Sequence, residues 1–423
     1  MERRDYRLIG ETVYSGILPN GLTVFVIPKH GFSKYFAYFA ANYGSIDRRF
    51  KHAGNWFDTP NGVAHFLEHK MFETADGDAM TKLSSNGAMP NAYTTSDLTA
   101  YHFDCTDRFF ENLETMLDFV STPYFTPEGV GKERGIIEQE ILMCEDDPDH
   151  CLYYGLMESL FKHHPLRDAV TGTVESVSRI TAETLSDCHN AFYNPSNMVL
   201  CVAGDVDPVK VAALAQNVLP DSRGSPPERD YGPKEDLRPV SNRFSREMDV
   251  SLPVFLAGCK LPSVANESEN LRFELTSTLA LELLSGHSSP LYFRLYDEGL
   301  ISSDFSASVD LVPGAAYLMF GGETREPARV FDAVLEEVFR VVESGPDPWL
   351  FNRIKKAAVG SYIRMLDSFD AICSSIAGGF FQGYEAFEAI DLLNEITEAD
   401  VSAFLRDCIS AENMAESLIL PKS

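Results

Sequence analysis

Two histidines and a glutamate stand within five consecutive residues of this 423-residue chain, in the segment His65-Phe66-Leu67-Glu68-His69. On an α-helix, residues four apart lie one above the other, so His65 and His69 can reach one metal ion together. Glu68 lies on nearly the same face, where its carboxylate can address a water bound to that metal. Two imidazoles, one acidic ligand and an open position for water are typical of hydrolytic zinc sites. The alternative is a helix with two exposed histidines and a salt-bridging glutamate.

The residues around this segment favour a site shielded from solvent. Pro60-Asn61-Gly62 predicts a turn that starts a helix. Apolar side chains surround the polar face, namely Val63, Ala64, Phe66, Leu67, Met71 and Phe72. Histidines embedded in such a run are expected to lie in a dry environment.

A third ligand is available in a second predicted helix. No proline interrupts positions 128–147, and Pro148 marks a natural stop. Glu133 and Glu140 are seven apart and share one helical face, whereas Glu138 is rotated by about 200° from Glu140. We therefore predict Glu140 as the ligand and Glu133 as a carboxylate that orients the site or steadies the water. These residues alone leave a second interpretation open, an acidic helix face in solvent.

Further motifs decide between these interpretations. In chain order they are Tyr43–Asp47, Gly62–Phe72, Asn91–Phe103, Glu133–Ile141, Phe192–Met198 and Val202–Asp205. In spacing and order the chain resembles the pitrilysin/insulinase family of zinc peptidases, which includes the mitochondrial processing peptidases. It is most similar to short bacterial members, often catalytic subunits paired with a related inactive subunit. The resemblance implies Zn²⁺ held by His65, His69 and Glu140, with Glu68 as general base and Glu133 as an additional acidic residue.

This chemistry predicts endopeptidic hydrolysis without a covalent intermediate. Zinc polarises the scissile carbonyl and acidifies water, and Glu68 transfers the proton to the leaving amine. Asn91 and Ala92 begin an extended run through Phe103, rich in Thr, Tyr and Phe, which favours a strand. The resemblance implies that this is an edge strand to which a peptide substrate adds, with Asn91 and Ala92 as contacts. From the residues alone, an ordinary strand with a capping Asn is the alternative.

The composition is that of an ordinary globular protein, with 44% hydrophobic and 23% charged residues. A net charge of −28 argues against nucleic acids and anionic membrane surfaces as partners. It is compatible with a cationic peptide substrate, although solubility is the preferred explanation. Eight cysteines without a Cys-x-x-Cys pair predict reduced thiols and a cytoplasmic location. We expect neither a signal peptide nor a membrane span, because no apolar run is long enough.

The chain is predicted to be α+β, with two similar halves, each an antiparallel or mixed sheet covered by helices. Residues 1–220 would form the catalytic zinc-binding half, 221–245 a linker, and 246–423 a homologous non-catalytic half. A stretch rich in proline, glycine and charge indicates the linker. Thr181 and Thr397 each open a helix at matching places of the two halves. The family resemblance implies the same duplicated architecture.

Other expected elements are a hairpin over residues 18–27 with an Asn-Gly turn, a strand over 35–43, a helix near 108–120 and a strand over 198–203. His163-His164-Pro165 predicts a turn or packing rather than a second metal site. The glycine-rich segment 378–383 lacks the residues of a phosphate loop. It is interpreted as a flexible apolar loop or hinge.

The second half lacks a His-x-x-Glu-His motif and departs from the family in residues 291–303. Family members usually carry an Arg and a Tyr there, which help to hold the substrate or its oxyanion. Here Tyr296 falls at the Arg position, Ser302 or Ser303 falls at the Tyr position, and Arg294 is half a helical turn away. Electrostatic stabilisation is commonly a large catalytic contribution. We therefore predict a heterodimer in which a homologous subunit supplies the Arg and the Tyr.

The leading hypothesis is the catalytic subunit of a zinc endopeptidase that acts on small or unfolded peptides, with precursor processing as one role. Two alternatives remain. One is a self-sufficient homodimeric oligopeptidase, and the other is a non-catalytic peptide-binding assembly protein.

Overall fold

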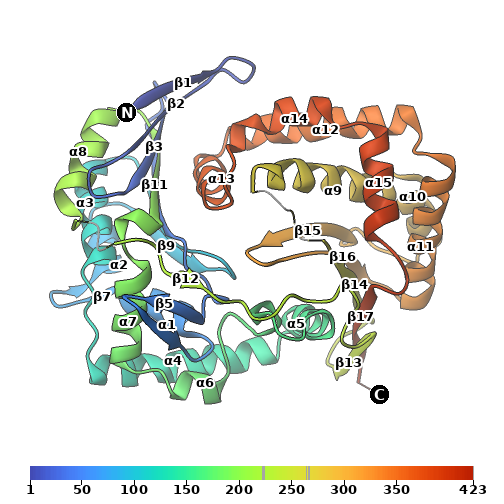
Figure 1. The fold of residues 1–423 in the computed structure, drawn as a ribbon, viewed down its shortest axis with the longest axis horizontal. Helices are drawn as coiled ribbons and strands as arrows, with labels where there is room; N and C mark the ends of the chain where they lie inside the picture. Colours follow the sequence, from blue (N-terminus) through green and yellow to red (C-terminus); the bar gives the residue numbers. More distant parts are fainter. Residues whose placement is uncertain (222–223, 263, 265–266, 423) are drawn as a thin grey trace. The chain divides into compact units, whose positions relative to one another are not determined.

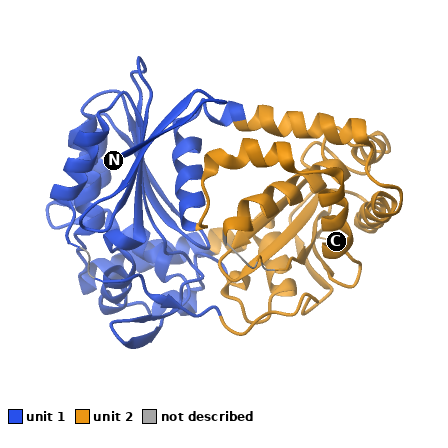
Figure 2. Cartoon of the chain, turned by 45° about the horizontal axis from the view of Figure 1, so that its top comes forward, with its two compact units in different colours: residues 1–141, 169–231, 363–381 blue, residues 142–168, 232–362, 382–423 orange. Residues whose placement is uncertain are grey.

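The computed structural model describes all residues except 222–223, 263, 265–266 and 423. The chain divides into two compact units that are interleaved along the sequence (Figure 2). Unit 1 contains residues 1–141, 169–231 and 363–381, and unit 2 contains residues 142–168, 232–362 and 382–423. Each unit is built on one large sheet with helices packed against it (Figure 1).

Unit 1 contains a seven-stranded sheet in the order β1-β2-β3-β11-β4-β10-β9. Its strands are β1 (Glu2–Tyr6), β2 (Glu11–Ile17), β3 (Thr23–Pro28), β4 (Tyr35–Ala41), β9 (Met89–Thr94), β10 (Thr99–Cys105) and β11 (Met198–Gly204). Strand β11 runs parallel to β3 and antiparallel to β4, so the sheet is mixed. Side chains alternate between the two faces, and Val24, Val26 and Phe39 belong to the main core.

Helices cover both faces of this sheet. Those packed around the main core are α1 (Val63–Met71), α2 (Ala79–Ser85), α3 (Phe109–Ser121), α4 (Pro127–Glu145), α6 (Val174–Ser178), α7 (Ala182–Phe192) and α8 (Pro208–Val218). The opposite face of β4 and β11 is covered by α13 (Phe369–Phe381), whose Phe380 contacts Phe25 of β3. Short strands complete the unit: β5 (Arg49–His52) and β6 (Asn55–Asp58) pair with β12 (Glu228–Arg229), and β7 (Glu73–Thr74) pairs with β8 (Gly77–Asp78).

Unit 2 contains a five-stranded sheet in the order β13-β17-β14-β16-β15. Its strands are β13 (Arg243–Met248), β14 (Val254–Lys260), β15 (Ser306–Val312), β16 (Ala315–Glu323) and β17 (Met414–Pro421). Strand β17 runs parallel to β13 and antiparallel to β14. The order β3-β11-β4-β10-β9 of unit 1 therefore recurs with the same relative directions. This confirms the predicted fold class, two similar α+β halves with sheets covered by helices.

The helices of unit 2 also cover both faces of its sheet. They are α5 (Pro148–Leu160), α9 (Asn270–Ser285), α10 (Pro290–Asp297), α11 (Pro327–Ser344), α12 (Pro348–Met365), α14 (Ala389–Glu395) and α15 (Glu398–Cys408). Helix α5 packs on β13, β14 and β17. There Leu152 forms a small hydrophobic cluster with Met248 and Ile419, separate from the larger core of unit 2. Within the described part of the chain, none of the helices combines the length and apolar character needed to cross a bilayer.

Each half of the sequence contributes one helix to the other half's sheet. Helix α13 belongs to the second half but packs in unit 1, and α5 belongs to the first half but packs in unit 2. Gly155 allows the close approach of α5, because a Cβ there would lie 2.3 Å from the Phe244 ring. This exchange explains why the units are interleaved. The boundaries 1–220, 221–245 and 246–423 describe successive repeats along the sequence and stay a prediction.

The run from Asn91 to Phe103 forms two antiparallel strands, β9 and β10, so the expectation of one extended strand is wrong. Between them, Thr95 Oγ1 accepts hydrogen bonds from the backbone N–H of Asp97 at 3.4 Å and of Leu98 at 3.1 Å. Short polar side chains that bond the backbone in this way favour turns. The reversal was missed because Thr and Tyr on both sides of the turn suit strands equally well.

The interpretation of residues 378–383 as a flexible loop is also wrong, because helix α13 continues to Phe381. Its buried residues recur with helical spacing and are Phe369, Ile372, Cys373, Ile376, Ala377 and Gly379. Glycine inside a helix costs about 1 kcal/mol relative to alanine. Packing of this apolar face against β4 and β11 outweighs that cost.

Several local predictions are confirmed. The Asn20-Gly21 turn joins β2 to β3, with Gly21 at a φ of +88°. Thr181 and Thr397 are the N-caps of α7 and α15. His164 starts a short 3₁₀ turn, where its Nδ1 accepts the N–H of Leu166.

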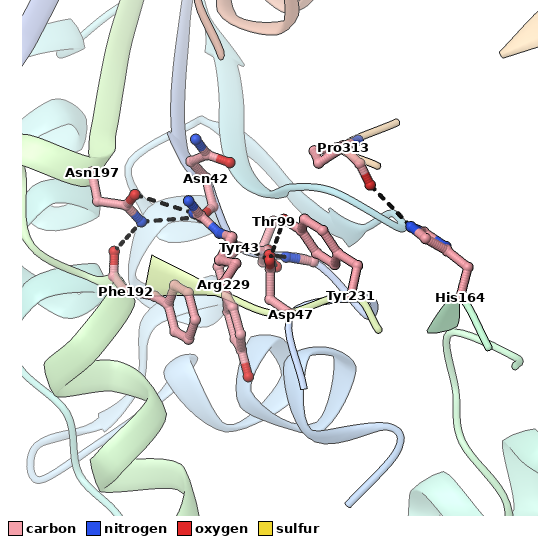
Figure 3. A network of polar contacts seen from close by, with 11 residues as sticks. Asn42, Tyr43, Asp47, Thr99, His164, Phe192, Asn197, Arg229, Tyr231 and Pro313 are labelled. Atoms are coloured by element: carbon pink, nitrogen blue, oxygen red, sulfur yellow. Dashed lines mark hydrogen bonds and ion pairs between the residues drawn. The ribbon is translucent and has the colours of Figure 1, made fainter. Parts of the chain in front are cut away.

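Asp47 anchors the segment that follows the midpoint of the chain (Figure 3). Arg229 Nε lies 2.9 Å from Asp47 Oδ1, and the Tyr231 hydroxyl donates to the same oxygen at 3.0 Å. Gly44 N–H donates to Oδ2 at 2.9 Å. Asp47 is only 2% exposed, and its burial raises the pKa of the carboxyl although the Arg229 charge and the two hydrogen bonds oppose the rise. Part of the stretch with linker composition is therefore packed against unit 1.

Candidate metal centre

Helix α1 positions the histidine motif. It begins directly after Gly62, which adopts a φ of +90°. A Cβ at Gly62 would also lie 2.6 Å from the carbonyl oxygen of Thr171, so both backbone angle and space require glycine. Phe66 and Leu67 are fully buried in the main core of unit 1. Their packing fixes which face of the helix carries the two imidazoles.

His65, His69 and Glu140 converge from α1 and α4. His65 Nε2 lies 3.5 Å from Glu140 Oε1, and His69 Nε2 lies 3.6 Å from Glu140 Oε2. One ligand atom from each of the three residues lies within 4.8 Å of the others. Among the described residues, this is the one group of three His, Cys, Asp or Glu side chains that could hold a metal ion.

The spacing of these atoms fits a tetrahedral ion better than direct hydrogen bonding. Both nitrogen–oxygen distances are longer than the 2.7–3.2 Å of ordinary N–H···O hydrogen bonds. Around a zinc ion with bonds of about 2.0–2.1 Å, neighbouring ligand atoms are about 3.3 Å apart. Two imidazole nitrogens and one carboxylate oxygen are also a donor set that zinc prefers. The residues present therefore fit the ion that the motif predicts.

Glu133 holds the outer nitrogen of His69. The two side chains meet at 3.0 Å between His69 Nδ1 and Glu133 Oε1. A carboxylate there favours the tautomer with hydrogen on Nδ1, which leaves Nε2 free to bind a metal. The contact with His69 also lowers the pKa of Glu133, against the effect of burial. For His69, burial lowers the pKa, but the bond to Glu133 and the charges of Glu68 and Glu140 more than offset this and raise it.

Glu140 has the electrostatic character of a ligand. Its polar contact with the His65 imidazole lowers the pKa of the carboxyl, although partial burial opposes this. The acid is therefore held in its charged, metal-binding form over a wider pH range than a free glutamate.

An ion pair at the end of α1 lies against α4. Lys70, which is fully buried, forms an ion pair with Glu73 directly after α1. A Cβ at Gly129 of α4 would lie 2.8 Å from both the Lys70 ammonium and the Glu73 carboxylate. Ile137 and Ile141 of α4 are buried in the same core as α1. The sequence analysis missed this pair, for which the polar residues at the end of the histidine motif are the only signal.

Glu68 lies on α1 with the two histidines, and its side chain is hydrogen-bonded to a residue of the sheet. It is 8% exposed, and its Oε2 accepts a hydrogen bond from Thr94 Oγ1 at 2.8 Å. Thr94 is the last residue of β9 and pairs with Thr99 across the hairpin. The sequence analysis did not assign a role to Thr94. Its position in a threonine-rich segment next to Asn91 was the available signal.

Strand β9 is the edge of the unit 1 sheet, as the family resemblance implied for the segment that contains Asn91 and Ala92. Alternation places Ala92 and Thr94 on the face packed against α1, and Asn91 and Tyr93 on the other face. Asn91 is exposed, and its Oδ1 accepts the N–H of Ala92 at 2.9 Å. The backbone amide of Ala92 is thus bonded to the side chain of the preceding residue.

The residues of interest in the second half lie in unit 2. Tyr296 is 52% exposed on α10, where its ring stacks on Tyr292 at a centroid distance of 5.9 Å. Arg294 lies on the same helix, about 200° around the axis from Tyr296. The Ser302 hydroxyl bonds Asp304. None of these residues belongs to the unit that carries the histidine motif.

Comparison with known proteins identifies the family. Residues 51–174 match the family model described as Insulinase (Peptidase family M16), and residues 179–358 match that of the Peptidase M16 inactive domain. The uncharacterized zinc protease YmfH of Bacillus subtilis is 36% identical over 428 residues, with 99% of both chains covered. This chain therefore belongs to the insulinase family, peptidase family M16, as the motifs predicted.

Solved structures agree with this assignment. The crystal structure of an M16-like peptidase from Alicyclobacillus acidocaldarius has a TM-score of 0.93 at 35% identity, and covers 97% of this chain and 99% of that chain. Pitrilysin has a TM-score of 0.78 at 17% identity, and the match covers 99% of this chain but 46% of pitrilysin. At that identity the similarity to pitrilysin concerns the fold alone.

Proposed function

We propose that this protein is a zinc-dependent endopeptidase. His65, His69 and Glu140 would hold Zn²⁺, Glu68 would be the general base, and Glu133 would orient His69. The convergence of two imidazole nitrogens on one carboxylate, at 3.5 and 3.6 Å, is the observation that carries the proposal. Membership of a family whose relatives are named zinc proteases supports it.

The chain's own residues would perform the proton transfers. Zinc, when bound, supplies Lewis acidity that polarises the scissile carbonyl and acidifies the attacking water. Glu68 accepts the proton of that water and delivers it to the leaving amine. Its place on α1 beside the two imidazoles, with 8% of the residue exposed, suits this role.

The substrate would be an extended peptide that adds to the edge strand β9. Backbone groups at a sheet edge bind peptides without regard to most side chains, so small or unfolded peptides are the expected class. Ala92 and Asn91 would contact the substrate backbone. The Asn91 side chain now occupies the Ala92 N–H and would have to release it.

We further propose that the active form is a heterodimer with a homologous subunit. Tyr296 stands where the family resemblance predicts an Arg, so a partner would supply the Arg and the Tyr that hold the substrate. Processing of a precursor peptide is one role for such a complex. We also propose a cytoplasmic location, because all eight cysteines are free thiols. Co-expression with candidate homologous subunits, followed by size-exclusion chromatography and peptidase assay, tests the heterodimer against an active homodimer.

Substitution of Glu68 by Gln tests the enzyme proposal directly. We expect E68Q to keep stoichiometric zinc and to lose about 10²–10⁴-fold in kcat, the usual contribution of a general base. Atomic absorption measures the zinc, and cleavage of a quenched fluorescent peptide measures the rate. E138Q is the matched control, because Glu138 lies on another face of α4. A wild-type chain that binds no zinc and cleaves no peptide in any oligomeric form would leave the alternative of a peptide-binding assembly protein.

A further inference from the structure

The Glu68 carboxylate is held in place from the sheet side. Thr94 Oγ1 donates to Glu68 Oε2 at 2.8 Å. Glutamate has three rotatable side-chain bonds, so burial of the residue alone does not define where both oxygens point. The hydrogen bond to Thr94 fixes one oxygen and leaves the other for a proton in transit.

The direction of this hydrogen bond follows from the neighbouring hydroxyl. Thr99 is fully buried and donates its one hydroxyl hydrogen to the carbonyl oxygen of Tyr43 at 2.8 Å. Thr94 Oγ1 lies 3.4 Å from Thr99 Oγ1, so Thr99 has no hydrogen left to give to Thr94. A carboxylate offers only acceptors. The Thr94 hydrogen is therefore directed to Glu68.

Thr94 also belongs to the element on which the substrate is proposed to lie. It is the last residue of the edge strand β9 and lies on the same face as Ala92, two residues earlier. One rigid strand thus carries a backbone site for the peptide and the hydroxyl that orients the carboxylate. Small misplacements of catalytic groups relative to a bound substrate lower rates by about 10²-fold.

We propose that Thr94 is a positioning residue that sets the orientation of Glu68 and ties it to the substrate-binding edge. The inference rests on the proposed function, in which Glu68 is the general base. Removal of the hydroxyl frees the carboxylate to rotate without a change in the peptide-binding backbone or in the metal ligands. We therefore expect removal of the hydroxyl to lower kcat, with little change in KM or in zinc content.

Two substitutions separate this role from simple packing. Thr94→Val keeps the shape and the strand preference but removes the hydroxyl, whereas Thr94→Ser keeps the hydroxyl. For the zinc-loaded full chain with any partner that it requires, we expect T94V to lower kcat about 10–100-fold with KM changed less than about threefold. We expect T94S to restore kcat to within about threefold of wild type. Thr115→Val is the matched control, because the Thr115 hydroxyl donates to the Glu111 carbonyl within its own helix, α3.

Crystal structures of T94V and T94S provide a readout that does not depend on activity. The proposal expects the Glu68 carboxylate to rotate in T94V and to keep its position in T94S. An unmoved carboxylate in T94V, an unchanged kcat in T94V, or equal kcat losses in both variants would overturn it. An inactive wild-type enzyme would instead overturn the proposed function, while the two structures still decide whether Thr94 orients Glu68.

Discussion

The two halves of the chain share one strand order but differ at the helices that carry the candidate metal site. In the first half, Arg134 of α4 donates to the Ile180 carbonyl at 2.9 Å, directly before the threonine cap of α7. In the second half, Lys355 of α12 donates to the Ile396 carbonyl at 2.8 Å, directly before the threonine cap of α15. A cationic side chain therefore makes the same contact in both halves. This contact aligns α4 with α12 residue by residue.

The aligned helices differ at the positions of Glu133 and Glu140. When Arg134 is matched to Lys355, Glu133 corresponds to Ile354 and Glu140 to Ser361. Ile354 is 4% exposed and belongs to the core of unit 2. Helix α9, which lies between β14 and β15 as α1 lies between β4 and β9, contains no histidine. The second half thus keeps the scaffold without the candidate metal-binding side chains, in agreement with its match to an inactive domain.

This difference separates what the fold needs from what the chemistry needs. The strand order and the cap contacts persist in the half that has lost the acids, so they are the structural requirement. The clustered imidazoles and carboxylates of the first half are not needed for packing, since an isoleucine fills one equivalent position. Partly buried polar groups that packing does not require carry a desolvation cost. Their retention in one half therefore favours a functional role there.

Replacement of Glu140 by Ser should have the largest effect, because it gives the first half the residue that the second half has at the equivalent position. We expect E140S to fold but to lose stoichiometric zinc and peptidase activity, since two imidazoles alone form an incomplete site. Circular dichroism measures folding, atomic absorption measures the zinc content, and cleavage of a quenched fluorescent peptide measures the activity. The reverse change, S361E, is the control and should leave one zinc per chain. Wild-type zinc affinity in E140S would show that Glu140 is not a ligand.

In each unit, one ion pair attaches part of the segment that follows the midpoint of the chain. Asp47 pairs with Arg229 in unit 1, and Lys260 pairs with Glu235 at 3.6 Å in unit 2. We expect R229M to destabilise unit 1 by about 3–5 kcal/mol, because it leaves the buried Asp47 charge without its partner. Urea unfolding measures the shift. R406M is the control, because Arg406 forms an exposed pair with Asp407.

For R406M the expected change is within about 0.5 kcal/mol, as for most surface substitutions. Equal stabilities of the two variants would mean that the Asp47 anchor contributes nothing. A large loss in R229M alone would establish that residues with linker composition form part of unit 1.

The sequence predicted which side chains of the candidate metal site share a helical face, because helical spacing is a local property. His65, Glu68 and His69 fall on one face by periodicity alone, and the seven-residue spacing of Glu133 and Glu140 does the same on α4. That the two helices meet required the family resemblance, since no local rule brings residue 140 to residue 65. The duplicated fold was predicted from the same resemblance and from weak repeated signals.

What the sequence did not predict depends on contacts between distant segments. Thr94 reaches Glu68 only because the run from 91 to 103 folds back on itself at short polar residues. Helix α13 forms through glycines because a sheet from the other half of the sequence covers its apolar face. The Arg229 side chain is only 17% exposed although its neighbours in the sequence are proline, glycine and charged residues. In each case a long-range partner overrides local preference.

Replacement of Glu133 by Ile copies the second half at a residue that contacts the proposed ligand His69 and is not itself a proposed ligand. We expect E133I to weaken zinc binding about 10–100-fold, the usual effect of losing a hydrogen-bonded partner of a metal-bound histidine. E133Q should lie between E133I and wild type, because its amide oxygen still accepts the N–H of His69. Competition with a chelator measures the dissociation constants. Three equal values would contradict an orienting role for Glu133.

Acid pH should change the stability contributed by the Asp47–Arg229 and Glu235–Lys260 pairs in different directions. The change for Glu235 is expected to be the smaller one. Burial raises the pKa of Glu235, but the N–H groups of His163, His164 and Lys162 and the charge of Lys260 more than offset this and lower it. A depressed folded-state pKa stabilises the protein above the unfolded value of about 4.3, and this stability is lost as pH falls through the folded pKa.

The measurement is the melting temperature of wild type and E235Q between pH 7 and about pH 3, where free glutamates become protonated. We expect wild type to be the more stable at pH 7 and the difference to shrink as the pH falls below about 4.3. The pH dependence of stability from Asp47 has the opposite sign, because burial raises the pKa of that carboxyl in the folded state. A difference between wild type and E235Q that does not change with pH would mean that packing of the side chain, and not its charge, joins the segment to unit 2.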